Sequence, residues 1–525
     1  MAIFKSFLTT VVTAVLLLAI TQSCNGVNAR GHRMMRKDEL HERQVEAAKR
    51  YAVENLLRTQ QDSLSTSALA VKNITFSNPK ASQFYVDGST IPLVDWDVGP
   101  SWSGLLPISS DPNETRQLFF WFFPPGPNGS LDDLIFWTNG GPGCSSLEGF
   151  LQENGPISWA YGQEKATRNQ YSWTNLSSVL WVEQPVGTGF SQGTPTARNE
   201  EDVASQLVGF LQQFLTVFSE LQGKNFYLTG ESYAGTYIPY IADYIYSHPT
   251  LLDLKLQGIW MADPLISWSV VQAQIPALDF VKKYDHVFSL NDTYMSQLEE
   301  ISAQCNYTGY VEKYVTYPPN DLMPLTWTDY TLPPACDIWN RILNATLITN
   351  PAFNVYRIFD MYPVLWDVLG FPGTFTSVQS PLYFDRPEVK KAIHAPLNVS
   401  WLECSNINVF PKNDSSLPPV FTVLPSVIEK SKRSVIIHGL GDYVLISDGA
   451  RIAIQNMTWA GQQGFQTAIA EDNFVVNGIG SVGNVHQERG LTYYEVILSG
   501  HMVPQFSPWS GFQSMQYLLG FRSTP

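Results

Sequence analysis

Residues 225–246 read NFYLTGESYAGTYIPYIADYIY. The first part, NFYLTG, is short, apolar and rich in aromatic residues, as buried strands are, and the part that follows has the pattern of a helix over 233–247. Ser232 stands between the two, in the string GESYAG (230–235). A serine on a sharp turn from strand to helix exposes its hydroxyl above an α/β sheet, where it can act as a nucleophile. The stretch therefore predicts a strand–turn–helix unit and a candidate active serine.

A closer literal match to Gly-x-Ser-x-Gly surrounds Ser191, in GFSQG (189–193). Its flanks are rich in Gly and Thr and are non-helical on both sides, so we expect a loop serine there. A second misleading string is the Gly-x-Gly-x-x-Gly at 478–483. A dinucleotide site needs a helix directly after these glycines, but the following residues predict a turn and a strand, so no cofactor site is expected.

Six short apolar runs predict buried parallel strands: 132–140, 177–185, 225–231, 256–264, 434–442 and 493–501. Helical patterns separate several of them, notably at 200–221 and 233–247. This alternation predicts an α/β fold with a doubly wound, mostly parallel sheet. Residues 265–375 interrupt the alternation and are rich in Pro and aromatic residues. We interpret them as a helical and loop insertion, a cap between late strands, and expect it to cover one face of the sheet.

A serine nucleophile needs a base, and the base needs an acid that orients it. In the α/β-hydrolase fold these groups follow in the order Ser, acid, His, each after a strand. Asp442 follows the run SVIIH, and His501 follows EVILSG. His501 stands immediately beyond the last apolar run, whereas His438 lies inside a predicted strand. We therefore expect Ser232, Asp442 and His501 to be the catalytic residues.

The negative oxygen that forms during acyl transfer needs backbone N–H donors. One candidate is the N–H of Tyr233, at the start of the helix. The second should come from an earlier junction of strand and loop, and NGGPG (139–143) after the run LIFWT is a Gly-rich turn of that kind. The alternative is that these glycines only form a structural turn.

The chain is acidic, with 47 Asp and Glu against 32 Lys and Arg among 525 residues. This balance argues against nucleic acid as a partner, because no basic surface is available to bind phosphates. The N-terminus has one Lys, then an apolar run from Phe7 to Ile20, then small and polar residues. We expect a signal peptide over residues 1–24, cleaved near 22–26. A membrane anchor is the alternative, but the run is short for a span.

Residues 25–70 are charged, helix-prone and nearly free of Gly and Pro. We interpret them as a leader removed after secretion, with a surface helix as the alternative, and 71–525 as the catalytic domain. Secretion agrees with the Asn-x-Ser/Thr sequons, which predict glycosylation at Asn73, Asn113, Asn128, Asn175, Asn291, Asn306, Asn344, Asn398, Asn413 and Asn456. It also agrees with four cysteines beyond the signal boundary, which allow two disulfides in three pairings: Cys144, Cys305, Cys336 and Cys404. Their spacing fits no zinc site.

Six strings together resemble the serine carboxypeptidases, particularly the secreted fungal members. They are WTNGGPGCSS (137–146), QENGP (152–156), VEQPVGTGFS (182–191), GESYAG (230–235), the Gly-x-x-Asp loop that ends at Asp442, and GHMVP (500–504). They occur in the order of the family and span about residues 137–504. Short motifs of this kind are weak one by one, but six in order make coincidence improbable.

The resemblance implies the triad named above and an oxyanion hole of Gly141 and Tyr233. It implies that the C-terminal carboxylate of the substrate is held by Asn139, the Gly140 N–H, Glu153 and Glu231. It implies the disulfides Cys144–Cys404 and Cys305–Cys336. Two positions depart from the family. Glu183 stands where members often have Asp, and Leu445 stands where some members have a free cysteine.

Two glutamates are an unusual choice for binding an anion. A carboxyl group that is buried beside a second carboxylate keeps its proton to higher pH and can then act as a donor. We therefore expect Glu153 and Glu231 to share a proton at acid pH and to bind the substrate carboxylate together. Met502 follows His501 and is expected to line the pocket of the leaving residue, with core packing as the alternative.

The leading interpretation is a secreted serine carboxypeptidase that acts at acid pH on peptide and protein C-termini, through an acyl-enzyme and without metal or cofactor. It is expected to be extracellular, with a vacuolar location as the alternative, and to have no stable membrane anchor. Two other functions stay open at this stage. One is an acyltransferase or esterase with the same triad, and the other is a non-catalytic binding protein on the same fold.

Overall fold

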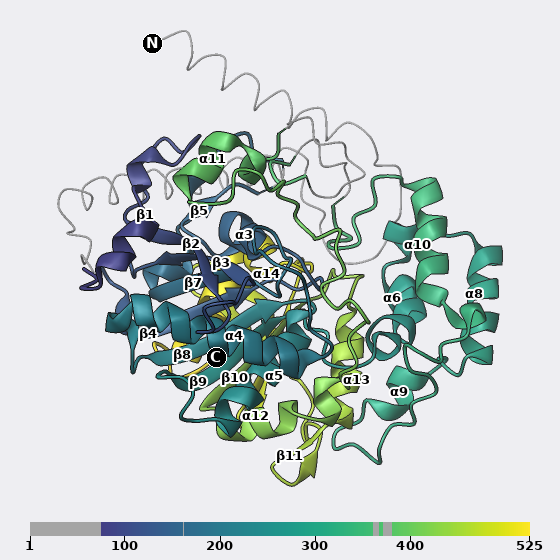
Figure 1. The fold of residues 1–525 in the computed structure, drawn as a ribbon. Coiled ribbons are helices and arrows are strands. Elements are labelled where there is room, and N and C mark those ends of the chain that lie inside the picture. Colours follow the sequence, from purple (N-terminus) through teal and green to yellow (C-terminus); the bar gives the residue numbers. More distant parts are fainter. Residues whose placement is uncertain (1–74, 161, 361–366, 371–380) are drawn as a thin grey trace. The chain divides into compact units, whose positions relative to one another are not determined.

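A large β-sheet is the centre of the described structure. The computed structural model describes residues 75–525 except 161, 361–366 and 371–380. The expected signal peptide (1–24) and leader (25–70) lie outside these residues. The sheet has eleven strands, in the order β1 (Tyr85–Val86), β2 (Ser101–Pro107), β3 (Gln117–Phe123), β7 (Ser177–Glu183), β4 (Ser130–Thr138), β8 (Asn225–Glu231), β9 (Lys255–Ala262), β10 (Arg433–Gly439), β15 (Leu491–Val496), β14 (Gly480–Glu488) and β13 (Phe474–Val476) (Figure 1).

The six central strands, from β7 to β15 in this order, are parallel. They coincide with the six apolar runs, so the predicted mostly parallel sheet is confirmed. The strands on either side are antiparallel: β1, β2 and β3 beside β7, and β14 and β13 beside β15. These edge strands were not predicted. In β14 two glycines, Gly480 and Gly483, dilute the apolar signal, whereas β3 (QLFFWFF) is apolar from its second residue onward.

Helices cover both faces of the sheet, because successive residues of a strand point to opposite faces. In β3, Phe120 and Phe122 belong to the core on one face, and Trp121 and Phe123 to the core on the other. The first face packs against α4 (Glu200–Val217), α5 (Ala234–Ser247), α12 (Leu424–Lys430) and α13 (Ser447–Asn456). The second packs against α3 (Ser146–Glu148), η3 (Gly149–Glu153), α11 (Pro387–Ala392), α14 (Val503–Phe506) and α15 (Pro508–Leu519).

The sequence of helix α4 determines both where the helix begins and which of its faces is buried. The Asn199 side chain accepts a hydrogen bond from the Asp202 N–H and caps the helix, and three carboxylates in the first turn favour its positive end. Leu207, Leu211 and Phe214 recur at helical spacing and are fully buried against the sheet. Each such side chain contributes about 1.5–3 kcal/mol on burial, so this apolar stripe fixes which face of α4 meets the strands.

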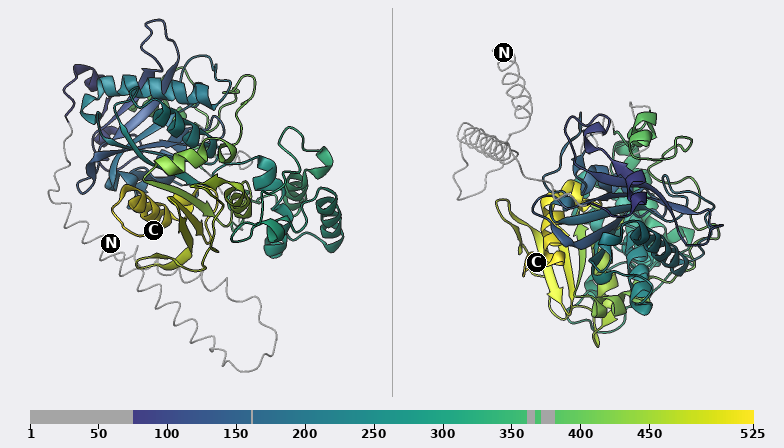
Figure 2. Two further views of the ribbon diagram at one scale, coloured as in Figure 1. Left: turned by 90° about the horizontal axis from the view of Figure 1, so that it is seen from below. Right: turned by 60° about the vertical axis from the view of Figure 1, so that its left-hand side comes forward.

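The insertion between β9 and β10 forms a core of its own. Its helices are α6 (Ala277–Lys283), α7 (Asp285–Phe288), α8 (Asp292–Gln304), α9 (Tyr310–Tyr314) and α10 (Ile338–Thr349). Figures 1 and 2 show α6, α8, α9 and α10 as a separate group beside the sheet. Their core includes Tyr443 and Ile446 from the segment after β10, but among the described residues it includes none of the eleven strands. The helices of the insertion therefore pack beside the sheet and not over one of its faces, whereas Val368 and Leu369, later in the same segment, belong to the core on the second face.

The remaining elements are short: η1 (Pro79–Phe84), η2 (Gly88–Thr90), β5 (Ile157–Ser158), β6 (Thr167–Arg168), η4 (Trp173–Asn175), η5 (Ser219–Leu221), η6 (Val270–Gln274), η7 (Pro334–Cys336), η8 (Tyr383–Asp385), η9 (Pro419–Phe421), β11 (Thr458–Trp459) and β12 (Gln462–Gln463). The string at 478–483 forms the turn and first residues of the β13–β14 hairpin. No helix follows it, but residues 484–488, where a turn was expected, belong to β14. Among the described residues, no helix has the length and apolar character needed to cross a membrane.

Candidate active site

Ser232 lies on a tight turn between β8 and α5. Its φ of 61° is in the left-handed region, which non-glycine residues rarely adopt and which costs of order 1–3 kcal/mol. Three backbone hydrogen bonds hold the turn: the Ser232 N–H donates to the Ala262 carbonyl, and the Ser232 carbonyl accepts from the N–H groups of Gly235 and Leu265, all at 2.9 Å. The side chain is partly exposed while its neighbours on both elements are buried. The turn thus presents the hydroxyl at the carboxyl edge of the sheet, as the sequence predicted.

Asp442 and His501 lie on the loops after β10 and β15, the strands next to one another in the sheet. His501 Nδ1 is 2.7 Å from Asp442 Oδ2, and both side chains are buried. Asp442 Oδ1 accepts a second hydrogen bond from the Val444 N–H at 2.7 Å. Burial alone would lower the pKa of His501, but the charges of Asp442 and Glu231 outweigh burial and raise it. The ring is therefore oriented by a carboxylate, with Nε2 left for another partner.

One pocket of about 380 Å³ joins these residues to the Gly-rich turn. Its lining contains most of the site residues that the sequence and the family resemblance indicate: Asn139, Gly140, Gly141, Glu231, Ser232, His501 and Met502. Glu153 and Asp442 are not part of the lining and lie buried behind it. The serine, the histidine and the glutamate of the expected substrate site therefore open into the same space.

Gly140 and Gly141 lie directly against the serine turn. A Cβ placed on Gly140 would be 2.4 Å from the Tyr233 nitrogen and 2.9 Å from the Ser232 Cβ, so no side chain fits there. Gly141 has φ 110°, which favours glycine. Among the described residues, neither the Gly141 N–H nor the Tyr233 N–H has a hydrogen-bond acceptor. Both donors stand beside the serine, which is the arrangement that an oxyanion hole needs.

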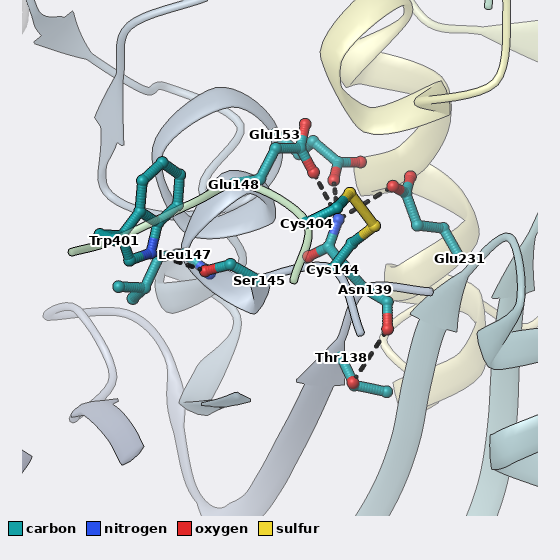
Figure 3. Close-up of a disulfide and its surroundings, with 10 residues drawn as sticks. All are labelled: Thr138, Asn139, Cys144, Ser145, Leu147, Glu148, Glu153, Glu231, Trp401 and Cys404. Carbon is teal, nitrogen blue, oxygen red and sulfur yellow. Dashed lines mark hydrogen bonds between the residues drawn. A yellow bond between two sulfur atoms is a disulfide. The ribbon is translucent and has the colours of Figure 1, made fainter. Parts of the chain in front are cut away.

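A cluster of three glutamates surrounds the side-chain amide of Asn139, as Figure 3 shows. Asn139 Nδ2 donates to Glu148 in a short hydrogen bond, to Glu231 at 2.9 Å and to Glu153 at 3.4 Å. The Trp137 indole N–H donates to Asn139 Oδ1 at 2.7 Å, which fixes the orientation of the amide. All three glutamates are at least 94% buried.

An amide nitrogen has two hydrogens, so it cannot satisfy three ionised carboxylates. Burial raises the pKa of Glu231 to about 7. Burial and then the charge of Glu231 raise the pKa of both Glu148 and Glu153 well above their ordinary range. One oxygen of Glu153 and one of Glu231 are buried without a hydrogen-bond partner among the described residues. The cluster therefore holds protons at acid pH and can donate them to an incoming anion.

The sequence did not indicate Glu148, Glu403 or Asp263. Glu148 belongs to α3 and lines the pocket together with Glu403, which precedes Cys404. Asp263 follows β9 directly and is fully buried beside Asp442. A single acidic residue in a helix or turn carries no pattern. The position of Asp263 at the end of a predicted strand was the only available signal.

Ser191 and Glu183 are structural. Ser191 Oγ accepts from the Phe119 N–H at 2.8 Å and donates to the Glu183 carbonyl at 2.5 Å, which ties β3 to the loop after β7. The Glu183 carboxyl receives short hydrogen bonds from the Ser145 hydroxyl and the Phe190 N–H. Burial raises the pKa of Glu183 to about 7. Glu183 therefore ties Ser145 to the loop after β7, and Ser191 is a loop serine as predicted.

The structure pairs Cys144 with Cys404 and Cys305 with Cys336, the pairing that the resemblance implies. The sequon asparagines that lie on the exposed surface are Asn113, Asn128, Asn175, Asn291, Asn306, Asn344, Asn398 and Asn413. Asn456 is partly buried and accepts a hydrogen bond from the Met323 N–H. Asn73 lies outside the described residues.

Two groups of described residues are tight enough to hold a metal ion. One consists of Asp263, Asp442 and His501, and the other is the glutamate cluster of Glu148, Glu153 and Glu231. In the first group His501 and Asp442 are hydrogen-bonded to each other, and in the second the amide of Asn139 donates to all three carboxyls. Both groups thus have mutual hydrogen bonds that fit proton chemistry.

Comparisons with known proteins place this site in context. The family model for serine carboxypeptidases matches residues 95–520. A probable serine carboxypeptidase of Arthroderma benhamiae is 43% identical over 469 residues, which cover 84% of this chain and 87% of that protein. The serine-type carboxypeptidase F of Aspergillus niger is 40% identical over 488 residues, which cover 87% of this chain and 90% of that protein.

Among solved structures, the fold resembles that of Kex1Δp, a prohormone-processing carboxypeptidase from Saccharomyces cerevisiae. The TM-score is 0.68 at 24% sequence identity, and the match covers 84% of this chain and 96% of that chain. The likeness concerns the fold. It agrees with the α/β-hydrolase arrangement of a mostly parallel sheet with helices on both faces.

Proposed function

Because this chain belongs to the serine carboxypeptidase family and is a peptidase, we propose that it is a secreted exopeptidase that releases C-terminal amino acids at acid pH. One observation supports this proposal most. A single pocket is lined by the partly exposed Ser232, by His501 and by two members of the glutamate cluster, Glu148 and Glu231. A nucleophile therefore faces the same space as a group that can recognise a chain end. Secretion is supported by two disulfides and by sequons on the exposed surface.

In the first half of the reaction, Ser232 Oγ attacks the last peptide carbonyl and its proton passes to His501 Nε2. Asp442 holds Nδ1 of the same ring and stabilises the imidazolium that forms. The carbonyl oxygen becomes negative and accepts hydrogen bonds from the N–H groups of Gly141 and Tyr233. The C–N bond then breaks, His501 gives its proton to the leaving nitrogen, and the C-terminal amino acid departs. In the second half a water molecule attacks the acyl-enzyme by the same route in reverse, and Ser232 is regenerated.

The substrate carboxylate is held by the group that surrounds Asn139. The Asn139 amide, the Gly140 N–H and protonated carboxyls of Glu153 and Glu231 act as donors, and we add Glu148 to this set because it shares the amide nitrogen. Protonation makes the cluster a receptor for an anion, which three ionised carboxylates would repel. An internal peptide bond offers no such carboxylate, which explains cleavage at the chain end.

Two ionisations with opposite demands set the working pH. His501 must be neutral to accept the serine proton, which limits activity at low pH. The glutamates must be protonated to hold the substrate, which limits activity as pH rises through about 7, the pKa of Glu231. The two groups are linked, since ionised Glu231 raises the pKa of His501 and protonated Glu231 does not. At acid pH the protonated cluster therefore binds the substrate carboxylate. Because Glu231 is then neutral, it no longer raises the pKa of His501, so more of the imidazole stays neutral and can accept the serine proton.

A direct test is to incubate the purified protein at about pH 5 with a peptide of known sequence and to follow its mass with time. We expect successive losses from the C-terminus, and a much slower loss from the same peptide with an amidated C-terminus. The Ser232→Ala variant should leave both peptides intact. Internal cleavage, or equal cleavage of the amidated peptide, would contradict the proposal.

A further inference from the structure

Asp263 occupies the position between the nucleophile and the acid of the triad. It follows β9, which lies between β8 and β10 in the sheet (Figure 1). Its N–H donates to the Ile437 carbonyl of β10 at 2.9 Å, and the preceding residue, Ala262, accepts from the Ser232 N–H at 2.9 Å. Its φ of 41° is left-handed, and it is fully buried. Backbone strain at a buried carboxyl beside a catalytic centre suggests a function for that carboxyl.

The two oxygens of Asp263 have different surroundings. Oδ1 accepts a hydrogen bond from the Gly439 N–H at 2.9 Å and lies 3.3 Å from His438 Nε2. Oδ2 is buried, and among the described residues it meets no donor. A carboxyl oxygen of Asp263 lies within 4.8 Å of ligand atoms of both Asp442 and His501. The neighbour of Asp263 is therefore a second buried carboxylate.

Among the residues that the structure describes, no permanent positive charge balances this pair of carboxylates. His438 Nε2 lies 2.6 Å from the Leu445 carbonyl, so this nitrogen carries a hydrogen and donates it. Burial lowers the pKa of His438, which keeps its ring neutral. His501 balances only one charge when it takes up a proton. Two adjacent buried carboxylates cannot both be ionised under these conditions, so one proton lies between them.

Hydrogen bonding decides which carboxyl carries the proton. Asp442 accepts from both the Val444 N–H and the His501 ring, each at 2.7 Å, and both donors stabilise its ionised form. Asp263 accepts one hydrogen bond from a backbone group, the Gly439 N–H. The Nε2–H of His438 lies near it but is shared with the Leu445 carbonyl. Burial, and then the charge of Asp442, raise the pKa of Asp263 well above its ordinary range.

We propose that Asp263 is a positioning residue of the triad, which carries a proton and donates it from Oδ2 to the carboxylate of Asp442. This inference rests on the proposed role of Ser232, Asp442 and His501. The donated hydrogen bond holds the Asp442 carboxylate in line with His501 Nδ1. The shared proton also keeps the total charge of the Asp263 and Asp442 carboxyl groups at −1. The groups that face Asp263 are Asp442 and His438 from β10 and the loop after it, Glu231 from the end of β8, and His501 from the loop after β15.

The sign of the pH effect follows from the protonated form. It exists below the raised pKa of Asp263, and loss of the proton at higher pH places a second negative charge against Asp442. That repulsion moves Asp442 away from its place beside His501, so turnover falls as pH rises. An amide at the same position would donate a hydrogen bond at every pH and would remove this ionisation.

The test uses Asp263→Asn and Asp263→Ala with a blocked amino-acid ester, which has no free carboxylate and does not depend on the glutamate cluster. We expect Asp263→Asn to keep kcat close to the wild-type value at about pH 5 and to shift the alkaline fall of the pH profile to higher pH. Asp263→Ala should lower kcat by about 10–100-fold, as the loss of a supporting hydrogen bond does. Asp133→Asn, at a buried aspartate of β4 outside the pocket, is the matched control and should keep the wild-type profile.

Wild-type kcat in Asp263→Ala would overturn the inference. So would an Asp263→Asn variant that is as weak as Asp263→Ala, or one whose pH profile matches the wild type. If Asp263→Ala fails to fold, the profile of Asp263→Asn still decides between these results. Ester hydrolysis that survives Ser232→Ala would instead contradict the proposed function, so the two failures are distinguishable.

Discussion

At the scale of single residues, the proposed chemistry depends on the unusual conformation of Ser232. Its left-handed backbone is held by bonds to two neighbouring segments, and its hydroxyl is more exposed than either flanking element. Ser191 has the better literal motif, but its hydroxyl accepts a hydrogen bond from Phe119 of β3 and donates one to Glu183 of β7. The two serines therefore differ in exposure and hydrogen bonding, and only Ser232 has a hydroxyl that a reagent in the pocket can reach.

A fluorophosphonate should label the protein at Ser232. The Ser232→Ala variant should lose labelling, and kcat should fall by about 10⁴-fold or more, since a triad without its nucleophile keeps only binding and oxyanion stabilisation. Ser191→Ala is the matched control. It should keep labelling, although it leaves the Phe119 N–H without its partner and destabilises the fold by about 1–3 kcal/mol. Labelling that depends on Ser191 would contradict the assignment.

The residues proposed as the triad could be indicated from the sequence because each lies on the turn or loop that follows a buried strand, and a sequence shows roughly where such strands end. The glutamate cluster was only partly predictable. Glu153 and Glu231 were indicated by family resemblance, whereas Glu148 and Asp263 were missed. Their importance comes from the hydrogen bonds and burial that the three-dimensional contacts create. A pKa depends on such contacts, and composition or spacing gives no information about them.

At the scale of elements, the Gly-rich turn after β4 has to lie flat against the start of α5. Gly140→Ala would place a methyl group 2.4 Å from the Tyr233 nitrogen, and both segments are backbone that cannot rotate away. We expect the turn to move and the oxyanion donors to separate, with kcat lower by about 10²–10³-fold.

The stability of the Gly140→Ala variant should be followed by thermal unfolding beside its kinetics. Gly162→Ala is a suitable control, because its Cβ meets open space. Its positive φ costs some stability without touching the pocket. Wild-type kcat in Gly140→Ala would show that the turn does not provide the oxyanion donor.

The two disulfides should have different effects, because they lie in different elements. Cys305 and Cys336 both belong to the core of the helical insertion. Their joint replacement by Ser should lower the free energy of unfolding by about 3 kcal/mol and leave ester turnover intact. Cys144 and Cys404 line the pocket, and the Cys144 sulfur lies close to Gly141. Their replacement should lower kcat as well, which steady-state kinetics beside thermal unfolding would reveal.

The central strands were predictable because both faces of each are buried, which gives continuous apolar runs. The arrangement of the insertion was not. Its composition marked it as a separate segment, but the residues its helices pack against, Tyr443 and Ile446, lie beyond β10, more than ninety positions after the end of α10. Long-range packing of this kind leaves no local pattern, which is why the position of these helices beside the sheet could not be predicted.

At the scale of the whole molecule, buried carboxyls link stability to pH. Burial raises the pKa of Glu183 and of Glu231 from 4.5 to about 7 each. A group with a raised pKa binds its proton more tightly in the folded state. Its contribution is complete below pH 4.5, the unfolded value, and is lost as pH rises to about 7. One such group contributes about 3 kcal/mol at most.

We therefore expect the melting temperature to fall as pH rises from about 4.5 to 7. Calorimetry across this range would measure it. Glu183→Gln, which cannot ionise and lies outside the pocket, should make the fall shallower. A melting temperature that rises toward neutral pH would show that these carboxyls are ionised in the folded protein.

The central claim is that a protonated glutamate cluster beside the triad recognises the free carboxylate of a chain end. It is tested most directly by measuring KM between about pH 4.5 and 8 for a blocked dipeptide and for the matching ester without a free carboxylate. The account predicts that KM for the peptide rises as pH passes through about 7, the pKa of Glu231, while KM for the ester stays flat. A peptide KM that is independent of pH, or one that changes in parallel with the ester KM, would contradict it.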